Sequence, residues 1–463
     1  MRPLHEFSAR ECADGVRRGV RSAEEVALHF IERVEAFNPS INALVQFDPI
    51  DVLRQAESVD ERLAIGEHLP LAGVPVTVKD NLWVAGYTIT QGSRLYADFV
   101  APRDAWAVAR LRDLGAVILG ISNCSEFACK GVTDNLVYGT THHPLDPTLT
   151  PGGSSGGAVA ALAAGLGLLA LGTDAGGSVR RPAAHTGLVG LKPSQGLIPH
   201  PWGFGEPNYG VSVVGLLARN AEDCAWLFDH LADFDAGDVS APALPVDWQA
   251  LAATHEAPPP GLRIAWSPRL GCDFAIDEDV LAALECQVQR LRDQGYSVVN
   301  DDPPWNKSVR DYPLDALQHA GLYALYARDL ASRPHDIDPV LLAQIEAGAR
   351  TESADRARLL RVRDQIARDL SHFFSVHDLL LCPTVPVVPW PHTRLGPAVI
   401  GGKPAGPRGH ALFTPLFNLC GVPACSVPAG HVRGAPVGLQ IVAPRFEDAR
   451  VLQMAAHLER LAA

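Results

Sequence analysis

The sequence predicts an α/β protein: a single domain with a large mixed, mostly parallel twisted central sheet flanked by helices. Three observations lead to this prediction. Short apolar runs alternate with stretches of helical periodicity, which is the order that strand–helix–strand units produce. The 463 residues contain no internal repeat and no clear domain boundary. Their composition, 47% hydrophobic and 20% charged, is typical of a globular chain.

The first predicted helix starts at Ser22, where Ser22 and Glu25 form a capping box and apolar residues follow at helical spacing. We expect Pro39 to end it. Alternating valines over 74–78 then predict a strand that places Lys79 at its carboxyl end. Further helices are expected over 104–114, 156–166, 220–234, 277–294 and 446–461. Further strands are expected over 117–122, 168–172, 262–266, 297–300, 378–382, 424–427 and 437–442. The region 310–370 is expected to be helical, but its pattern does not fix where each helix begins and ends.

Glycine and proline are in excess: 41 plus 37 is 78 of 463 residues, about 17% against an average of about 12%. The proline-rich segments 235–260 and 383–408 interrupt the regular order. Loops this long are usually functional, and we expect loops 200–212, 303–345 and 383–410 to shape a binding pocket.

The charge balance and the cysteines exclude several classes of protein. A net charge of −13 argues against a nucleic-acid surface. The apolar run 158–172 is too short for a membrane span, and the charged N-terminus argues against a secretion signal. Nine cysteines without metal-binding spacing suit a cytoplasmic protein with reduced thiols. The pair His142–His143 has no third ligand at useful spacing, so we expect neither a metal nor another cofactor.

Three segments offer polar side chains in an apolar, glycine-rich setting: VPVTVKD (74–80), PGGSSGGAVAA (151–161) and GTDAGGSVRRPAA (172–184). A poorly hydrated Lys79 would have a lowered pKa and could act as a general base. Ser154, Ser155 and Ser178 are then candidate partners, because a serine needs an adjacent base to become a nucleophile. The residues alone do not decide which of these serines is the nucleophile.

Gly176 and Gly177 remove side chains just before Ser178, so backbone N–H groups can approach a substrate oxygen. Residues 175–178 are therefore a candidate oxyanion hole. A short helix that begins near Ser178 would add its positive end.

Simpler interpretations compete with this chemistry. A lysine after a strand is usually a solvated edge charge, and glycine-rich turns are usually only turns. The run GGSSGG lacks the ending of a phosphate-binding loop. Gly152, Ser154 and Gly156 match the GxSxG nucleophile elbow, but no strand is predicted directly before them, as that motif requires.

Together, these stretches resemble the amidase signature family of serine hydrolases. The segments 151–161, 173–184 and 187–196 are similar to its signature core, and LAGVPVTVKD (71–80) is similar to its lysine segment. The segments 413–430 and 436–452 resemble its C-terminal part. The resemblance implies one amidase domain over 1–463, with a signature core at about 70–220 and a more variable, helical, pocket-lining region at about 235–410.

The resemblance also implies site residues. Ser178 corresponds to the acyl-forming nucleophile, Ser154 to a bridging serine that follows a cis peptide bond, and Lys79 to the base. The backbone of Ala175, Gly176, Gly177 and Ser178 corresponds to the oxyanion hole. Supporting positions are Ser155, Thr173, Asp174 and Arg180, with Asp174 and Arg180 as a structural ion pair. The segment 122–133 matches the pocket region, with Phe127, Ala128 and Cys129 as substrate contacts.

The leading hypothesis is an amidase that hydrolyses a small linear amide through an acyl-enzyme on Ser178, releasing ammonia or an amine. The sequence allows a homodimer and predicts neither a nucleic-acid nor a membrane partner. The alternative is the glutaminase (A-type) component of a tRNA-dependent amidotransferase, although NLCGVPACSVPAG (418–430) resembles general amidases more. A catalytically silent binding protein and an esterase of the α/β-hydrolase type are further hypotheses.

Overall fold

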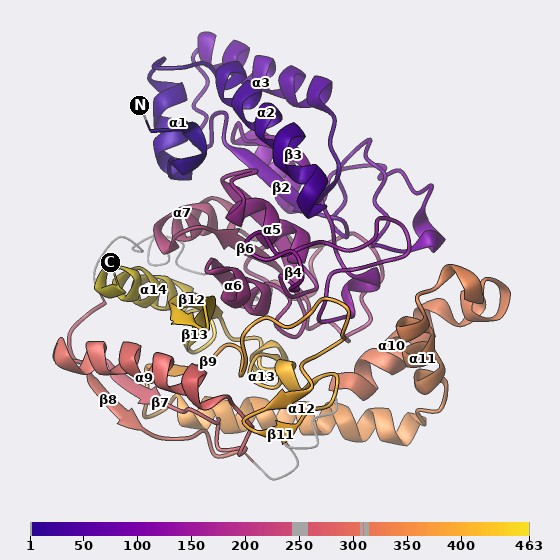
Figure 1. Cartoon of the computed structure of the whole chain (residues 1–463), viewed down its shortest axis with the longest axis vertical. Helices are drawn as coiled ribbons and strands as arrows, with labels where there is room; N and C mark the ends of the chain where they lie inside the picture. The colour runs from indigo at the N-terminus through magenta and orange to yellow at the C-terminus, as the bar shows by residue number, and fades with distance from the viewer. Residues whose placement is uncertain (1, 243–257, 306–308, 310–313, 463) are drawn as a thin grey trace.

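A computed structural model of the chain describes residues 2–242, 258–305, 309 and 314–462 (Figure 1). One sheet of eleven strands passes through these residues in the order β1-β3-β2-β4-β6-β5-β12-β13-β9-β7-β8. In Figure 1 it extends from β3 and β2, below the N-terminal helices, to β7 and β8 at the opposite end of the molecule. The strands are β1 (Leu44–Gln46), β2 (Pro75–Lys79), β3 (Val117–Ser122), β4 (Leu169–Asp174), β5 (Val189–Lys192), β6 (Val213–Ala218), β7 (Arg263–Trp266), β8 (Ser297–Asn300), β9 (Leu379–Pro383), β12 (Ala424–Val432) and β13 (Ala435–Val442).

The prediction of a mixed α/β sheet is confirmed, but the expected majority of parallel strands is wrong. Within the described residues the parallel pairs are β2–β3, β2–β4, β7–β8 and β7–β9, whereas the other neighbours in the sheet pair antiparallel. The short strands β5 and β6 take part in half of the antiparallel pairs, and the pairs β1–β3, β12–β13 and β13–β9 make up the other half. Strands β5 and β6 were not predicted, and together with β12 and β13 they join the two parallel parts of the sheet through antiparallel ladders.

Helices flank the sheet. The predicted helices are found as α2 (Ala23–Ile41), α4 (Trp106–Asp113), α5 (Gly156–Ala163), α7 (Ala221–Leu231), α9 (Glu278–Asp293) and α14 (Asp448–Ala462). Helix α6 (Arg180–Thr186) is the short helix expected near Ser178, and the predicted helical region 310–370 contains α10 (Leu314–Ser332), α11 (Pro339–Ala349) and most of α12 (Ser353–Phe373). The remaining helices are α1 (Ala9–Arg17), α3 (Pro49–Ala64) and α13 (Pro415–Leu419). The small ribbon of β10 (Val399–Ile400) and β11 (Lys403–Pro404) is separate from the main sheet.

Helix α2 begins as predicted, since Ser22 and Glu25 form both hydrogen bonds of a capping box. It does not end at Pro39. Pro39 lies in its last turn, and the helix ends before Asn42, which adopts a left-handed conformation with φ of 53°. Most of the proline-rich segment 235–260 lies outside the described residues, as do 310–313 of the predicted helical region.

The order of the central strands positions the candidate site. Strand β2 is buried along its whole length and lies between the parallel strands β3 and β4. Because β2 and β4 are parallel neighbours, their carboxyl ends meet at one edge of the sheet, where α/β proteins commonly bind ligands. Lys79 ends β2 and Asp174 ends β4, so the two signature segments meet at that edge.

Candidate active site

Lys79 is fully buried at the end of β2. Its Nζ lies 2.8 Å from Ser154 Oγ, 3.0 Å from Thr173 Oγ1 and 3.4 Å from the Thr173 carbonyl oxygen. Asn81 Nδ2 donates to the same Thr173 hydroxyl at 2.9 Å, which fixes its position. Burial lowers the pKa of Lys79 from 10.5 to about 8, because desolvation disfavours the ammonium form. The apolar strand therefore places a lysine that readily gives up its proton directly against a serine.

The structure separates the two serines that the sequence left equivalent. Ser154 follows a cis peptide bond with Gly153, as the resemblance implied. Its hydroxyl contacts Lys79, whereas Ser155 Oγ is buried and has no hydrogen-bond partner among the described residues. The Ser155 backbone N–H donates to the carbonyl oxygen of Ser178 at 3.2 Å. Ser155 thus connects the segments of the other two serines through its backbone.

Ser178 lies in the loop between β4 and α6 and is 6% exposed, whereas Lys79 and Ser154 are both 0% exposed. It reaches two cavities, so a substrate can approach Ser178 but not the lysine beneath it. This is the arrangement expected if Ser178 meets the substrate and the two buried groups act behind it.

The loop 175–178 supplies backbone donors beside Ser178. Gly177 has φ of 109°, and a side chain there would meet Thr414 Oγ1 at 2.1 Å. The Gly177 N–H donates to Asp174 Oδ1 at 2.7 Å and is therefore not free for a substrate. The N–H groups of Ala175, Gly176 and Ser178 have no partner among the described residues. They are the ones that could bind an oxyanion.

Asp174 and Arg180 form a fully buried ion pair of 2.8 Å. Burial alone would raise the pKa of Asp174, but the Arg180 charge and hydrogen bonds from Arg180, Asn418 and Gly177 outweigh it and hold the pKa below its usual range. The guanidinium of Arg180 also donates to Asn418 Oδ1 at 2.6 Å and to Gln440 Oε1 at 2.7 Å. The pair ties the loop before Ser178 to the C-terminal part of the sheet.

Ser178 lies where two cavities meet, and both include Ala128, Ala175 and Asn208. The first, which we call the charged cavity, measures about 220 Å³ and is lined by Lys130, Arg181, Asp315, Gln318 and Arg408, among others. The second, which we call the aromatic cavity, measures about 80 Å³ and includes Phe127, Phe204, Asn81, Gln91 and Pro207. Each of the three segments expected to shape the pocket contributes, through Asn208, Gln318 and Arg408, but Gln318 lies in helix α10 and not in a loop as expected.

The three residues expected to contact the substrate lie in different surroundings. Phe127 and Ala128 have left-handed backbone conformations and line the cavities. Cys129 does not line either cavity and packs, together with Phe127, into an apolar cluster with Leu322 and Tyr326. Burial raises the pKa of its thiol to about 12, so Cys129 stays protonated.

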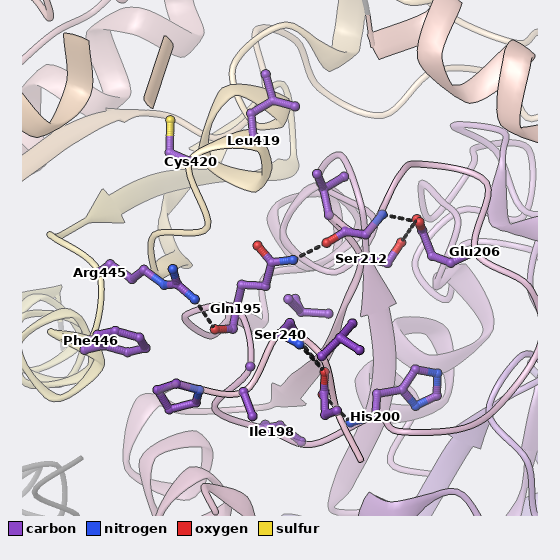
Figure 2. Close-up of a pocket in the computed structure, with 18 of the residues that line it drawn as sticks. Gln195, Ile198, His200, Glu206, Ser212, Ser240, Leu419, Cys420, Arg445 and Phe446 are labelled. Atoms are coloured by element: carbon purple, nitrogen blue, oxygen red, sulfur yellow. Dashed lines mark hydrogen bonds between the residues drawn. The ribbon is translucent and has the colours of Figure 1, made fainter. Parts of the chain in front are cut away.

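A cavity of about 1,200 Å³ lies beside this site rather than in it, and Figure 2 shows residues that line it. Figure 2 shows Gln195 at its centre, where Arg445 donates to the Gln195 carbonyl at 3.0 Å, and Glu206 at one side, where it accepts from the Ser212 hydroxyl at 2.5 Å. His200, Glu206, Ser212 and Val213 line both this cavity and the aromatic cavity. Ser178, Ser154 and Lys79 do not line it.

Sequence reasoning did not single out Arg181, Asn208 or Arg408. Arg181 had a local signal, as the second arginine of the VRRP run. Asn208 and Arg408 lie in irregular loops, where no periodicity marks a residue as facing a cavity. Within the described ranges, no group of three or more His, Cys, Asp or Glu side chains is placed to hold a metal ion. None of the described helices combines the length and apolar character needed to cross a lipid bilayer.

Comparisons with known proteins agree with this geometry. The family model described as Amidase matches residues 25–452. An acylamidase from Rhodococcus erythropolis is 36% identical over 466 residues, covering 98% of this chain and 95% of that protein. The A-type component of the glutamyl-tRNA(Gln) amidotransferase from Moorella thermoacetica is 34% identical over 480 residues, covering 99% and 97%. The crystal structure of a bacterial aryl acylamidase of the amidase signature family matches with a TM-score of 0.90 and 27% identity, covering 99% of this chain and 97% of that one.

Proposed function

The chain belongs to the amidase family, and on that premise we propose that it hydrolyses the C–N bond of a small linear carboxylic amide through an acyl-enzyme on Ser178. The products are a carboxylic acid and ammonia or an amine. One observation carries the proposal: Lys79 Nζ lies 2.8 Å from Ser154 Oγ in a fully buried position beneath the accessible Ser178.

The hydrogen bonds around Lys79 support its role as a base. A neutral amine has two N–H groups and one lone pair. Thr173 offers Lys79 two acceptors, its hydroxyl and its carbonyl oxygen. When both N–H groups donate to Thr173, the lone pair is left to accept the proton of Ser154. The Asn81 amide, which donates to the Thr173 hydroxyl, keeps this acceptor in place.

Catalysis then proceeds as a proton relay. Lys79 takes the proton of Ser154, Ser154 takes the proton of Ser178, and Ser178 Oγ attacks the amide carbonyl. The free N–H groups of Ala175, Gly176 and Ser178 stabilise the charge that develops on the carbonyl oxygen. When the C–N bond breaks, the relay returns a proton to the leaving nitrogen. Water, activated by the same relay, releases the acid from Ser178.

The remaining parts of the chain supply substrate binding in this proposal. The signature core at about 70–220 carries the relay, and the region at about 235–410 contributes Asp315, Gln318 and Arg408 to the charged cavity. Phe127 and Ala128 are the proposed contacts from the core. We further propose a cytoplasmic location, which buried free thiols such as Cys124 and Cys382 suit.

A second candidate function is the glutaminase step of a tRNA-dependent amidotransferase. It is favoured by the A-type amidotransferase component from Moorella thermoacetica, whose identity to this chain, 34%, is close to the 36% of the acylamidase. The two functions differ in what activity requires. An amidase releases ammonia or amine alone, whereas an A-type component would need its partner proteins and would prefer glutamine.

Covalent labelling tests the proposed nucleophile. A fluorophosphonate probe should modify Ser178, as mapped by peptide mass spectrometry, and the Ser178→Ala protein should not be labelled. Labelling confined to Ser154 would overturn the role assignment. A panel of aliphatic amides, aryl amides and glutamine, scored for ammonia or amine release by the purified chain alone, separates the two functions. Release from glutamine only when partner proteins are added would favour the second.

A further inference from the structure

The peptide bond between Gly176 and Gly177 is the part of the loop 175–178 that its own sequence restrains least. Neither residue carries a side chain, and Gly177 has φ of 109°, a conformation that other residues rarely adopt. A peptide plane between two glycines turns at little steric cost. Contacts from other parts of the molecule must therefore fix its orientation.

Hydrogen bonds hold this peptide plane at both ends. The Gly177 N–H donates to Asp174 Oδ1 at 2.7 Å, and Asp174 lies just before the same loop, at the end of β4. The Gly176 carbonyl oxygen accepts from Thr414 Oγ1 at 2.8 Å. Thr414 lies 238 residues after Gly176 and directly before α13. One of the two hydrogen bonds that orient the peptide therefore comes from the C-terminal part of the chain.

Thr414 is itself held in place on several sides. It is fully buried, and its carbonyl oxygen accepts from Arg180 Nη1 at 2.9 Å. Asn418, one turn later, donates to the carbonyl oxygen of Asp174 at 2.9 Å. A side chain built at Gly177 would meet Thr414 Oγ1 at 2.1 Å and Thr414 Cβ at 2.6 Å, so Thr414 packs directly against the peptide that it binds.

The orientation of this peptide determines where two of the free backbone donors point. The N–H groups of Gly176 and Ser178 have no partner among the described residues, and they belong to the peptides directly before and after it. A displacement of the central peptide therefore moves both. An oxyanion donor acts at about 2.7–3.1 Å from the oxygen that it stabilises, so a shift of about an ångström removes its contribution.

We propose that Thr414 is a positioning residue for amide hydrolysis: its hydroxyl holds the Gly176–Gly177 peptide so that the N–H groups of Gly176 and Ser178 face the carbonyl under attack. The inference rests on the proposed function and adds to it a residue outside the signature core. Thr414 is not among the described residues that line the charged or the aromatic cavity. Its contribution should therefore appear in kcat, which reports the transition state, and not in KM.

General support of the fold is the competing explanation, because Thr414 is buried and its backbone binds Arg180. The two roles predict different measurements. A supporting role alone would lower the free energy of unfolding and leave kcat per folded active site unchanged. A positioning role lowers kcat per active site, and the binding of an analogue of the transition state weakens with it.

Thr414→Val tests the hydroxyl, since valine has nearly the same shape and cannot donate a hydrogen bond. With a neutral amide, kcat per titrated active site should fall at least about tenfold, while KM changes by less than about twofold. An aliphatic trifluoromethyl ketone adds to the attacking serine and forms an oxyanion, so its affinity should fall by about the same factor as kcat/KM. Thr414→Ser keeps the hydroxyl and should retain most of the activity.

Thr186→Val is the matched control. Thr186 is also buried, and its hydroxyl also donates to a backbone carbonyl, that of Pro182, at 2.8 Å. Its described hydrogen bonds go to Pro182 and Ala183, within α6, and not to the loop 175–178. This substitution should leave kcat and the affinity for the ketone unchanged.

An unchanged kcat in folded Thr414→Val would overturn the proposal. A loss in Thr414→Ser as large as that in Thr414→Val would also overturn it, because the methyl group and not the hydroxyl would then be responsible. If Thr414→Val does not fold, Thr414→Ala replaces it with the same expected loss of kcat.

The rate of fluorophosphonate labelling at Ser178 keeps this test separate from the proposed function, because labelling also builds negative charge beside the loop 175–178. The rate should fall at least about tenfold in Thr414→Val and stay unchanged in Thr186→Val. Equal rates in Thr414→Val and the wild-type protein would refute the role of Thr414. A wild-type chain that is labelled but cleaves no amide would refute the proposed function and leave the role of Thr414 to the labelling rates.

Discussion

The buried contact between Lys79 and Ser154 predicts a steep dependence of activity on pH. Lys79 must be neutral to accept a proton, and its pKa is about 8. The neutral fraction is then about 10% at pH 7, about 1% at pH 6 and about 0.1% at pH 5. Because the pKa is lowered by burial, activity is lost as the pH falls through about 8 and is fully present above it. We expect kcat/KM to fall about tenfold for each pH unit below about 7.

Two measurements check this prediction on the same protein. The kcat/KM for a neutral amide, which does not itself ionise, should be followed between about pH 5 and about pH 10. The rate of fluorophosphonate labelling should be followed in parallel, because it reports activation of Ser178 without the later release of the acyl group. Both curves should bend near pH 8. Circular dichroism at each pH verifies that the protein stays folded.

A profile that stays flat down to about pH 5 in folded protein would refute the reasoning, because a charged ammonium cannot accept the serine proton. A bend near pH 6.5 would point to a histidine instead. The residual activity of Lys79→Ala provides the internal control. It should be low and should no longer bend near pH 8.

Four substitutions test other parts of the site. Ser154→Ala should lower kcat by roughly 1,000-fold, whereas Ser155→Ala, which removes a hydroxyl without a described partner, should lower it by less than about tenfold. Gly177→Ala should lower kcat by at least about 100-fold, because its new methyl group would lie 2.1 Å from Thr414 Oγ1 and displace the loop of backbone donors. Asp174→Asn should lower the free energy of unfolding in urea by about 3–5 kcal/mol, because it leaves the charge of Arg180 buried and unpaired.

Each of these predictions has a result that would contradict it. Equal losses in Ser154→Ala and Ser155→Ala would remove the distinction between the two serines. Gly430→Ala is the control for Gly177, since Gly430 has φ of 104° but open space around it; a comparable loss of kcat there would show that backbone strain, not the clash, is responsible. A change below about 1 kcal/mol in Asp174→Asn would place the pair among surface-like ion pairs.

The sequence predicted those parts of the fold that depend on short-range signals. Helix α2 starts at its capping box, and β2 and β3 are parallel neighbours joined through α4, as the strand–helix–strand order indicated. Strands β5 and β6 were missed, although their four and six residues equal the lengths of the predicted strands β8 and β3. Their antiparallel pairing depends on contacts with distant strands, which the local pattern does not record.

The residues of the candidate site also fall into those that the sequence could predict and those that it could not. Lys79, Ser154 and Ser178 lie in dense motifs, so the sequence could mark them, and the family resemblance assigned their order. Arg181 and Asn208 acquire their significance only from what surrounds them in three dimensions. The hydrogen bond between Thr414 and Gly176 joins residues that are 238 positions apart, and no local pattern along the chain expresses it.

Helices α10 and α11 form a compact pair that projects at the side of the molecule in Figure 1 and enters the chain between β8 and β9. Lys79, Ser154 and Ser178, in contrast, lie within one uninterrupted stretch of about a hundred residues that contains β2 and β4. The proposed catalytic residues and the α10 side chains that line the charged cavity thus lie in separate stretches of the sequence. A helical pair from another family member could be grafted between β8 and β9 to redirect the enzyme to new amides, while the hydrolytic machinery is inherited intact.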